Sequence, residues 1–409
     1  MHSKPIRTIP TLAVLFTLAA AGCDAPPSPP TATVFDSSGV RIVDLGPAPL
    51  EWAEHRTLAG EPDLVIRSSE DDGATVLSDV RDVEVLPRGR VALANGSGND
   101  ILVFNATGEH VATWGGTGDG PGEFRSLEWL ASLPPDFLAA GDGRLRRVTV
   151  FDSEGGFARS FATASAVDPA SRPVPPRPLG LLARGSVIAA YFDRPAAVEG
   201  TARPAVEIVA TAPTGDAMHM MGTWPGDELA LFPQDGQLQI TQAPFGRRLH
   251  IAPAHDGVWI ADDDRWQMRK YSARGVLRMI VRSSASPTAV TDELLEAYIA
   301  ERYRYADQVP ALEDLKRDQR EIAQHTTTPA FGTILGTTAG GVAIGEFRLD
   351  TVSPRAWITV DPAGSACSVE LPAGLDVKRW GPDWVIGVVR DALDREEIHR
   401  YRIVAGPGS

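Results

Sequence analysis

A spacing that recurs 47 residues apart constrains the fold of this chain more than any other sequence feature. The pattern is an aromatic residue, a glycine four residues on, and a second aromatic residue six further. It occurs at Phe104, Gly108 and Trp114 and again at Phe151, Gly155 and Phe161. The residues around each glycine read as two strands joined by a tight turn. The chain is therefore predicted to repeat a small antiparallel unit.

Further copies extend the repeat along the chain. A third copy lies at Tyr271, Gly275 and Val281, and weaker copies centre on Gly215 and Gly364. The unit from Pro178 to Leu229 departs most, because Pro195 and Pro204 interrupt it. A period of about 40 to 50 residues with several strands per unit is typical of a β-propeller, in which each sheet buries its faces against its neighbours.

The stretch from Trp114 to Phe124 holds five glycines among the eight residues 115–122. Glycine adopts backbone angles closed to other residues, so this stretch predicts a tight irregular turn. We interpret it as the connection from an outer strand to the inner strand of the next unit, with Phe124 anchored in the core. The alternative is a ligand-cradling loop, but no Lys-Ser/Thr pair follows, and Pro121 stands where a dinucleotide fingerprint needs glycine.

A ring of blades needs closing, because exposed sheet edges invite aggregation. Val40–Val43 and Leu64–Ile66 precede the first full repeat, and Trp384–Ile386 and Ile398–Val404 follow the last. We predict that strands from both ends of the chain share the closing blade.

One segment, about 288–325, breaks the strand rhythm. Thr291 is a plausible N-cap, and Leu295 and Ile299 fall on one helical face with Tyr298. Pro310 interrupts and suits the start of a second helix. The segment predicts two amphipathic helices, which serve as a packed decoration, as a lid over the axial opening or as a docking arm for a partner.

With these motifs the chain resembles the six-bladed β-propellers of the NHL-type repeat group, in particular bacterial exported proteins. The resemblance rests on Ile101–Phe104 with Gly108, Gly118–Phe124, Trp259–Asp262 and Phe35–Val43. It implies an all-β, six-bladed propeller over residues 34–404, with the helical insertion between the fourth and fifth blades. Relatives by fold include metal-dependent lactonases and an amidating lyase, but none of their catalytic residues maps onto a matching position here.

The N-terminus has the features of an export signal. Lys4 and Arg7 precede the apolar run Leu12–Ala21, which is too short to span a bilayer. Residues Ala20 to Gly22 before Cys23 resemble the lipobox of bacterial lipoproteins, although Ala20 stands where leucine is commoner. This implies a signal peptide over 1–22, a lipidated Cys23 and anchoring to the cell envelope, on the periplasmic side or the cell surface; an ordinary secretory signal is the alternative. Residues 23–33 are proline-rich and predict a disordered linker.

Composition limits the partners. Cys367 is the one cysteine besides Cys23, so no intramolecular disulfide is expected in the mature chain. The formal net charge of -14 argues against nucleic acid and against docking on anionic lipid. We expect a monomer.

No strong catalytic motif occurs, so no catalytic, cofactor-binding or metal-ligating residue is assigned and no cofactor is predicted. Three groups of residues are nevertheless candidate sites. They are His250 and His255 with Asp262, Asp263 and Asp264; His219 among methionines; and Tyr298, Tyr303 and Tyr305 with Arg302 and Arg304. A plain loop, an adaptable hydrophobic patch and ordinary helix packing, respectively, explain them more simply.

The sequence thus favours a membrane-anchored, extracytoplasmic binding module for a peptide, a glycan or an envelope protein. The alternative is a metal-dependent hydrolase or lyase whose site lies in the axial channel.

Overall fold

The computed structural model describes residues 32–68, 75–163, 174–211, 218–234, 237–304, 312–322, 325–350 and 353–406. The signal peptide 1–22, Cys23, most of the linker 23–33 and the repeat copy at Gly215 lie outside these residues. The described chain is built mainly of strands, with α-helices only in the segment before β24.

Strand pairing groups most of the described strands into four-stranded antiparallel units. The first unit contains β5 (Val80–Val85), β6 (Val91–Asn95), β7 (Asp100–Phe104) and β8 (His110–Gly115). The second contains β9 (Leu127–Leu133), β10 (Phe137–Asp142), β11 (Arg147–Phe151) and β12 (Phe157–Ala162). The third contains β13 (Arg177–Leu181), β14 (Val187–Phe192), β16 (Ala205–Thr211) and β17 (Met218–Pro225).

The remaining units follow the same plan. The fourth contains β20 (Leu249–Ala254), β21 (Gly257–Asp262), β22 (Gln267–Tyr271) and β23 (Leu277–Arg282). The fifth contains β24 (Thr333–Gly336), β25 (Val342–Gly345), β26 (Arg355–Val360) and β27 (Ala366–Leu371). The last combines β28 (Asp376–Trp380), β29 (Trp384–Arg390) and β30 (Glu396–Ala405) with β4 (Leu64–Arg67) from the start of the chain.

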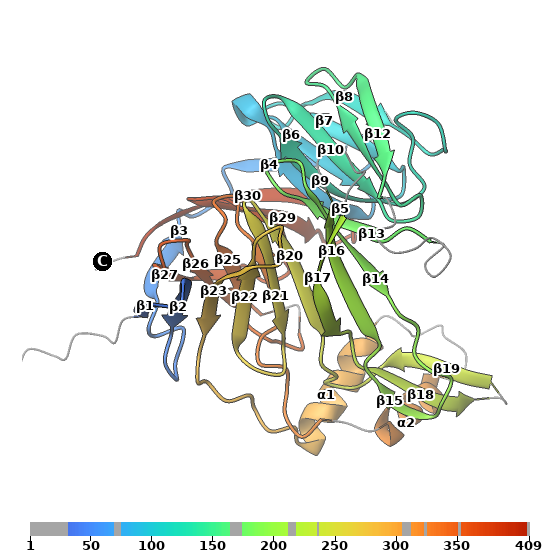
Figure 1. Cartoon of the computed structure of the whole chain (residues 1–409), viewed down its shortest axis with the longest axis vertical. Helices are drawn as coiled ribbons and strands as arrows, with labels where there is room; N and C mark the ends of the chain where they lie inside the picture. Colours follow the sequence, from blue (N-terminus) through green and yellow to red (C-terminus); the bar gives the residue numbers. More distant parts are fainter. Residues whose placement is uncertain are drawn as a thin grey trace, which may run out of the picture.

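The units form a closed ring. Inner strands contact one another in the order β5, β9, β13, β20, β24, β28 and back to β5. A buried hydrophobic cluster lies between each pair of neighbouring units. In β7, Ile101 packs toward the second unit and Leu102 toward the last, because successive side chains of a strand point to opposite faces. A strand whose two faces are covered by neighbouring units therefore needs a continuous apolar run. The fold is the predicted all-β propeller (Figure 1).

Closure of the ring is partly as predicted. β4 pairs antiparallel with β30, so Ile66 lies opposite Ile398 and both ends of the chain share one unit. The prediction for Val40–Val43 was wrong. β2 (Val40–Asp44) runs parallel to β23 with β1 (Thr33–Ser37) at its edge, so this hairpin extends the fourth unit. β3 (Glu54–Leu58) bridges β27 and β30.

The repeated glycines end the turns between the two outer strands of their units. Their φ angles are all positive, at Gly108 (87°), Gly155 (88°), Gly275 (71°) and Gly364 (102°). The residue three positions before the glycine fixes the turn: the carboxylate of Asp152 accepts hydrogen bonds from the amides of Glu154 and Gly156 at 2.9 and 2.8 Å. A side chain that caps its own turn and a residue free to take positive φ explain why this spacing recurs.

The glycine-rich stretch makes the predicted connection between β8 and β9. Trp114 and Phe124 are buried, and the ring centroid of each lies 6.1 Å from that of Phe151 in the next unit. The guanidinium of Arg147 donates to the carbonyls of Asp119, Gly120 and Glu123 at 2.7 to 3.0 Å. The stretch is therefore held from within the fold rather than shaped around a ligand.

Additional elements gather at one end of the ring (Figure 1). α1 (Asp292–Arg302) and α2 (Leu312–Glu321) lie between β23 and β24, where two helices were predicted. Thr291 caps α1 by accepting from the Leu294 amide at 3.3 Å, and Leu295 and Ile299 are buried. A small sheet of β15 (Gly200–Ala202), β18 (Leu229–Gln234) and β19 (Gln237–Gln242), not predicted from the sequence, packs beside them through Ala230 against Ile322.

Candidate functional site

A cavity of about 790 Å³ opens where the turns of the first two units meet. Its walls come from the β5–β6, β7–β8, β9–β10 and β11–β12 turns, with Ala183 and His255 contributed by the third and fourth units. His255 follows β20, so the cavity lies at the end of the ring opposite to the segment that precedes β20. This volume falls within the range of small-molecule sites.

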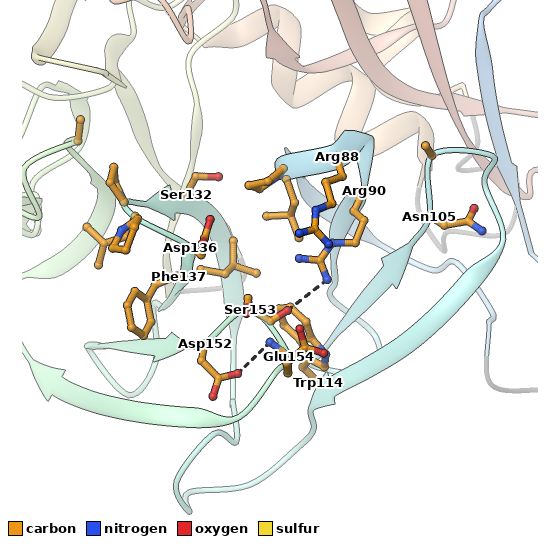
Figure 2. Close-up of a pocket in the computed structure, with 18 of the residues that line it drawn as sticks. Arg88, Arg90, Asn105, Trp114, Ser132, Asp136, Phe137, Asp152, Ser153 and Glu154 are labelled. Carbon is orange, nitrogen blue, oxygen red and sulfur yellow. Dashed lines mark hydrogen bonds between the residues drawn. The ribbon is translucent and has the colours of Figure 1, made fainter.

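One wall of the cavity is basic. Arg88 and Arg90 flank Gly89 in the β5–β6 turn, and both side chains project into the cavity (Figure 2). Arg88 sits at φ 64°, in the left-handed region that non-glycine residues seldom adopt. Arg90 donates to the Ser153 carbonyl at 3.2 Å. Neither arginine forms an ion pair with any residue that the structure describes, so both can donate to a ligand.

The other walls are acidic and apolar. Asp136, in the β9–β10 turn, and Phe137, at the start of β10, lie across the cavity from the arginines, and Asp152 and Glu154 lie on the β11–β12 turn (Figure 2). The exposed rings of Pro134 and Pro135 extend the apolar surface beside Phe137. The cavity thus offers donors, acceptors and an apolar face together.

An ion cluster lies beside the cavity, where the inner strands β5, β9 and β28 meet. The guanidinium of Arg379 lies 2.9 Å from carboxylate oxygens of both Asp82 and Glu84. The hydroxyl of Ser132, which also lines the cavity, donates to Glu84 at 2.7 Å. Burial raises the pKa of Glu84, and the Arg379 cation and the Ser132 hydrogen bond act against that rise. Both inner-strand carboxylates therefore pair with one arginine.

The structure separates the histidines weighed as metal ligands. His250 lies at one end of β20, 3.3 Å from the Asp263 carboxylate, whereas His255 lies past the other end. Asp262 pairs with Arg203 at 2.8 Å, and Asp264 lies 3.4 Å from Arg247. Among the described residues, no three His, Cys, Asp or Glu side chains are grouped so that they could hold a metal ion.

The other candidate site residues of the sequence also contact neighbouring residues of the fold. His219 is exposed, and its ring nitrogen lies 2.8 Å from the Arg274 carbonyl. On α1, Tyr298 packs against Phe245, and Glu301 pairs with Arg304, which follows the helix. Tyr305 and Pro310 lie outside the described residues.

Sequence reasoning missed Arg88, Arg90 and the Arg379 cluster. A signal was present for the cluster, because Asp82 and Glu84 alternate with Val83 and Val85 on one strand. Their partner Arg379 is almost 300 residues away, which only the ring closure brings near.

Fold and cavity together define a β-propeller protein with a ligand-sized cavity at one end of its ring. No family model matches the chain, and no curated protein matches it. Similar solved structures include a protein from Bacteroides fragilis described as exported (11% identity, TM-score 0.46, covering 87% of this chain and 99% of that one). Virginiamycin B lyase from Staphylococcus aureus is also similar (9% identity, TM-score 0.39, 83% and 98%), as is a gluconolactonase from Xanthomonas campestris (11%, 0.41, 85% and 97%).

Within the described ranges, neither α1 nor any other helix has the length and apolar character that crossing a bilayer requires.

Proposed function

We propose that this chain is a non-catalytic binding module whose cavity between the β5–β6 and β9–β10 turns takes a short extended peptide. The observation that carries the proposal is the pairing of Arg88 and Arg90, which have no ion-pair partner in the described residues, with an apolar face opposite them. A peptide presents carbonyl and carboxylate acceptors, amide donors and apolar side chains within one chain. The cavity offers the complement of each.

A peptide fits better than a glycan. Sugar rings are commonly held by stacking on an open aromatic face, but the Trp114 ring is only 6% exposed and packs on Phe151. The open apolar surface is made by Pro134, Pro135 and the half-buried Phe137. Proline rings and a single aromatic edge suit peptide side chains.

The proposal also includes a setting for the protein. In this proposal the protein is a monomeric, six-bladed propeller over residues 34–404. The linker 23–33 connects the propeller to Cys23, and a lipid on Cys23 anchors it to the outer side of a bacterial membrane. The ring of inner-strand contacts supports the blade count, and the sequence around Cys23 supports the anchor.

The test is a binding screen of the purified protein against a hexapeptide array and a glycan array, followed by titration of the best peptide. Arg90→Ala and Phe137→Ala are each expected to raise the Kd of that peptide about tenfold, since each removes a side chain from one wall of the cavity. Phe157→Ala is the matched control, because this phenylalanine is 44% exposed on β12, outside the cavity lining. Binding of glycans but no peptide would contradict the proposal. So would a stoichiometric metal whose chelation abolishes a hydrolytic activity.

A further inference from the structure

We propose that a second cavity, under helix α1, is a binding site for a small organic oxyanion, a carboxylate or phosphate attached to an apolar body. The cavity has a volume of about 350 Å³ and lies between α1, the segment before β20 and the β25–β26 connection. It is independent of the peptide cavity. Arg248, before β20, lines this one and His255, after β20, lines the other, so the two lie at opposite ends of the ring.

Arginines dominate the lining. Arg248, Arg302, Arg348 and Arg355 all contribute, from three separate stretches of the chain. Arg348 pairs with Glu346 at 3.0 Å. Within the described part of the chain the other three make no ion pair, and two of them donate only to neutral groups. These are the Gln242 amide oxygen at 2.8 Å from Arg248, and the Thr241 and Tyr298 hydroxyls at 2.8 and 3.3 Å from Arg302.

The carboxylates in the same lining are already engaged. Asp263 is buried and accepts from the Arg248 amide at 2.8 Å, and its other oxygen faces His250. Glu301 pairs with Arg304. The cavity therefore carries uncompensated positive charge on a chain whose formal net charge is -14. Four arginines line the cavity against two carboxylates. An excess of positive charge in a cleft concentrates anions, so the site selects anions against the trend of the whole surface.

The remaining lining is aromatic. Ring centroids of Tyr298 and Phe347 lie 5.0 and 6.4 Å from that of Phe245. Phe245 is 3% exposed and holds φ at 54°, a conformation that costs a bulky residue energy and that surrounding structure must enforce. Forked guanidinium groups that bind two oxygens at once, next to an aromatic wall, match an oxyanion joined to an apolar group.

The experiment titrates the full-length folded protein with three probes by calorimetry at low salt: inorganic phosphate, phenyl phosphate and benzoate. We expect phenyl phosphate or benzoate to bind with a Kd below about 1 mM, and inorganic phosphate to bind at least tenfold more weakly because it lacks the apolar part. The organic probe with the lower Kd shows whether the site prefers a phosphate or a carboxylate. Failure of both, or equal affinity for inorganic phosphate, would overturn the proposal.

Variants locate the binding. Arg302→Gln and Arg355→Gln are each expected to raise the Kd about tenfold or more, as loss of a charge-assisted hydrogen bond does. Arg269→Gln is the matched control: this exposed arginine also donates to a glutamine, Gln267, at 2.7 Å, but outside the cavity. Unchanged affinity in both cavity variants would refute the site. Should Arg302→Gln fail to fold, Arg355→Gln and Arg302→Lys provide the same comparison. Arg90→Ala leaves this binding intact, which separates the result from that of the peptide cavity.

Discussion

At the residue scale, the Arg379 cluster shows how charged side chains on the inner strands of the propeller are paired. Arg379 also donates through its Nε to the Val83 carbonyl at 3.0 Å and through its Nη2 to the Leu130 carbonyl at 2.9 Å. One guanidinium thereby ties the last unit to the first two, and the last unit meets the first because the ring closes. Breaking a buried ion pair is costly because the partner charges stay behind without compensation.

Arg379→Met is therefore expected to lower the free energy of unfolding by about 3–5 kcal/mol near neutral pH. The loss should depend on pH. The folded-state pKa of Glu84 is raised above 4.5, so stability falls as the pH rises from about 4.5 through that raised pKa. Without the Arg379 cation the pKa rises further, and the decline becomes larger. Urea unfolding at pH 5 and pH 8 should show the greater loss at pH 8.

Arg402→Met is the control for this prediction. Its side chain is 61% exposed and pairs with Asp63 on the surface, where an ion pair contributes about 0–1 kcal/mol. Equal losses for the two arginine variants, or a greater loss for Arg379→Met at pH 5, would contradict the account of the cluster.

At the scale of elements, the connection between β8 and β9 depends on particular glycines. Gly115 has a φ of 78°, and a Cβ there would lie 2.7 Å from the Gly122 carbonyl oxygen. Gly120 is not at positive φ, and a Cβ there would meet the flexible end of Glu123 at 2.9 Å. From the sequence alone, Gly120 and Gly115 are equivalent members of a glycine-rich stretch.

Gly115→Ala is expected to lower the free energy of unfolding by about 1–3 kcal/mol, because both the backbone angle and the space oppose the side chain. Gly120→Ala should cost less, since Glu123 can turn away. Thermal unfolding of both variants makes the comparison. A larger loss for Gly120→Ala would show that the Glu123 contact, and not the angle at Gly115, fixes the connection.

Elements that depend on local sequence were predictable, and those that depend on distant pairing were not. The turn at Gly155 follows from Asp152 and the glycine itself, and the start of α1 follows from Thr291. The place of β2 beside β23 could not be predicted, because nothing within Val40–Val43 distinguishes one sheet edge from another. The small sheet with β15 was not predicted, because Pro195 and Pro204 indicate an interrupted blade and no local pattern shows that β15 pairs with β18.

The same distinction explains the sites. The histidines and tyrosines that are candidate site residues in the sequence contact other residues of the fold, as His250 contacts Asp263. Arg88 and Arg355 carry no motif. Their significance comes from turns and strands that the ring brings together and from the lack of an ion-pair partner in the described residues, which no local pattern encodes.

At the scale of the whole molecule, the two cavities face opposite ways along the ring, with β20 running between them. Among the described elements, α1, α2 and the small sheet of β15, β18 and β19 gather at the end that holds the cavity under α1 (Figure 1). One end of the ring is thus open, whereas the other end carries the additional elements. A tether at the N-terminus would present both to solvent, provided that the folded part stands clear of the surface that carries it.

Cys23→Ser tests that tether. Acyl chains on Cys23 would hold the protein at a membrane, since two or more chains give stable anchoring, and the linker 23–33 would keep the propeller clear of the bilayer. We expect the variant to move from the membrane pellet to the soluble fraction after ultracentrifugation and to lose incorporation of labelled palmitate, with its melting temperature unchanged. Cys367→Ser provides the matched control, because burial raises the pKa of that half-buried thiol on β27 and it should remain unmodified. Continued sedimentation of Cys23→Ser with the membranes would mean that another part of the chain holds it there.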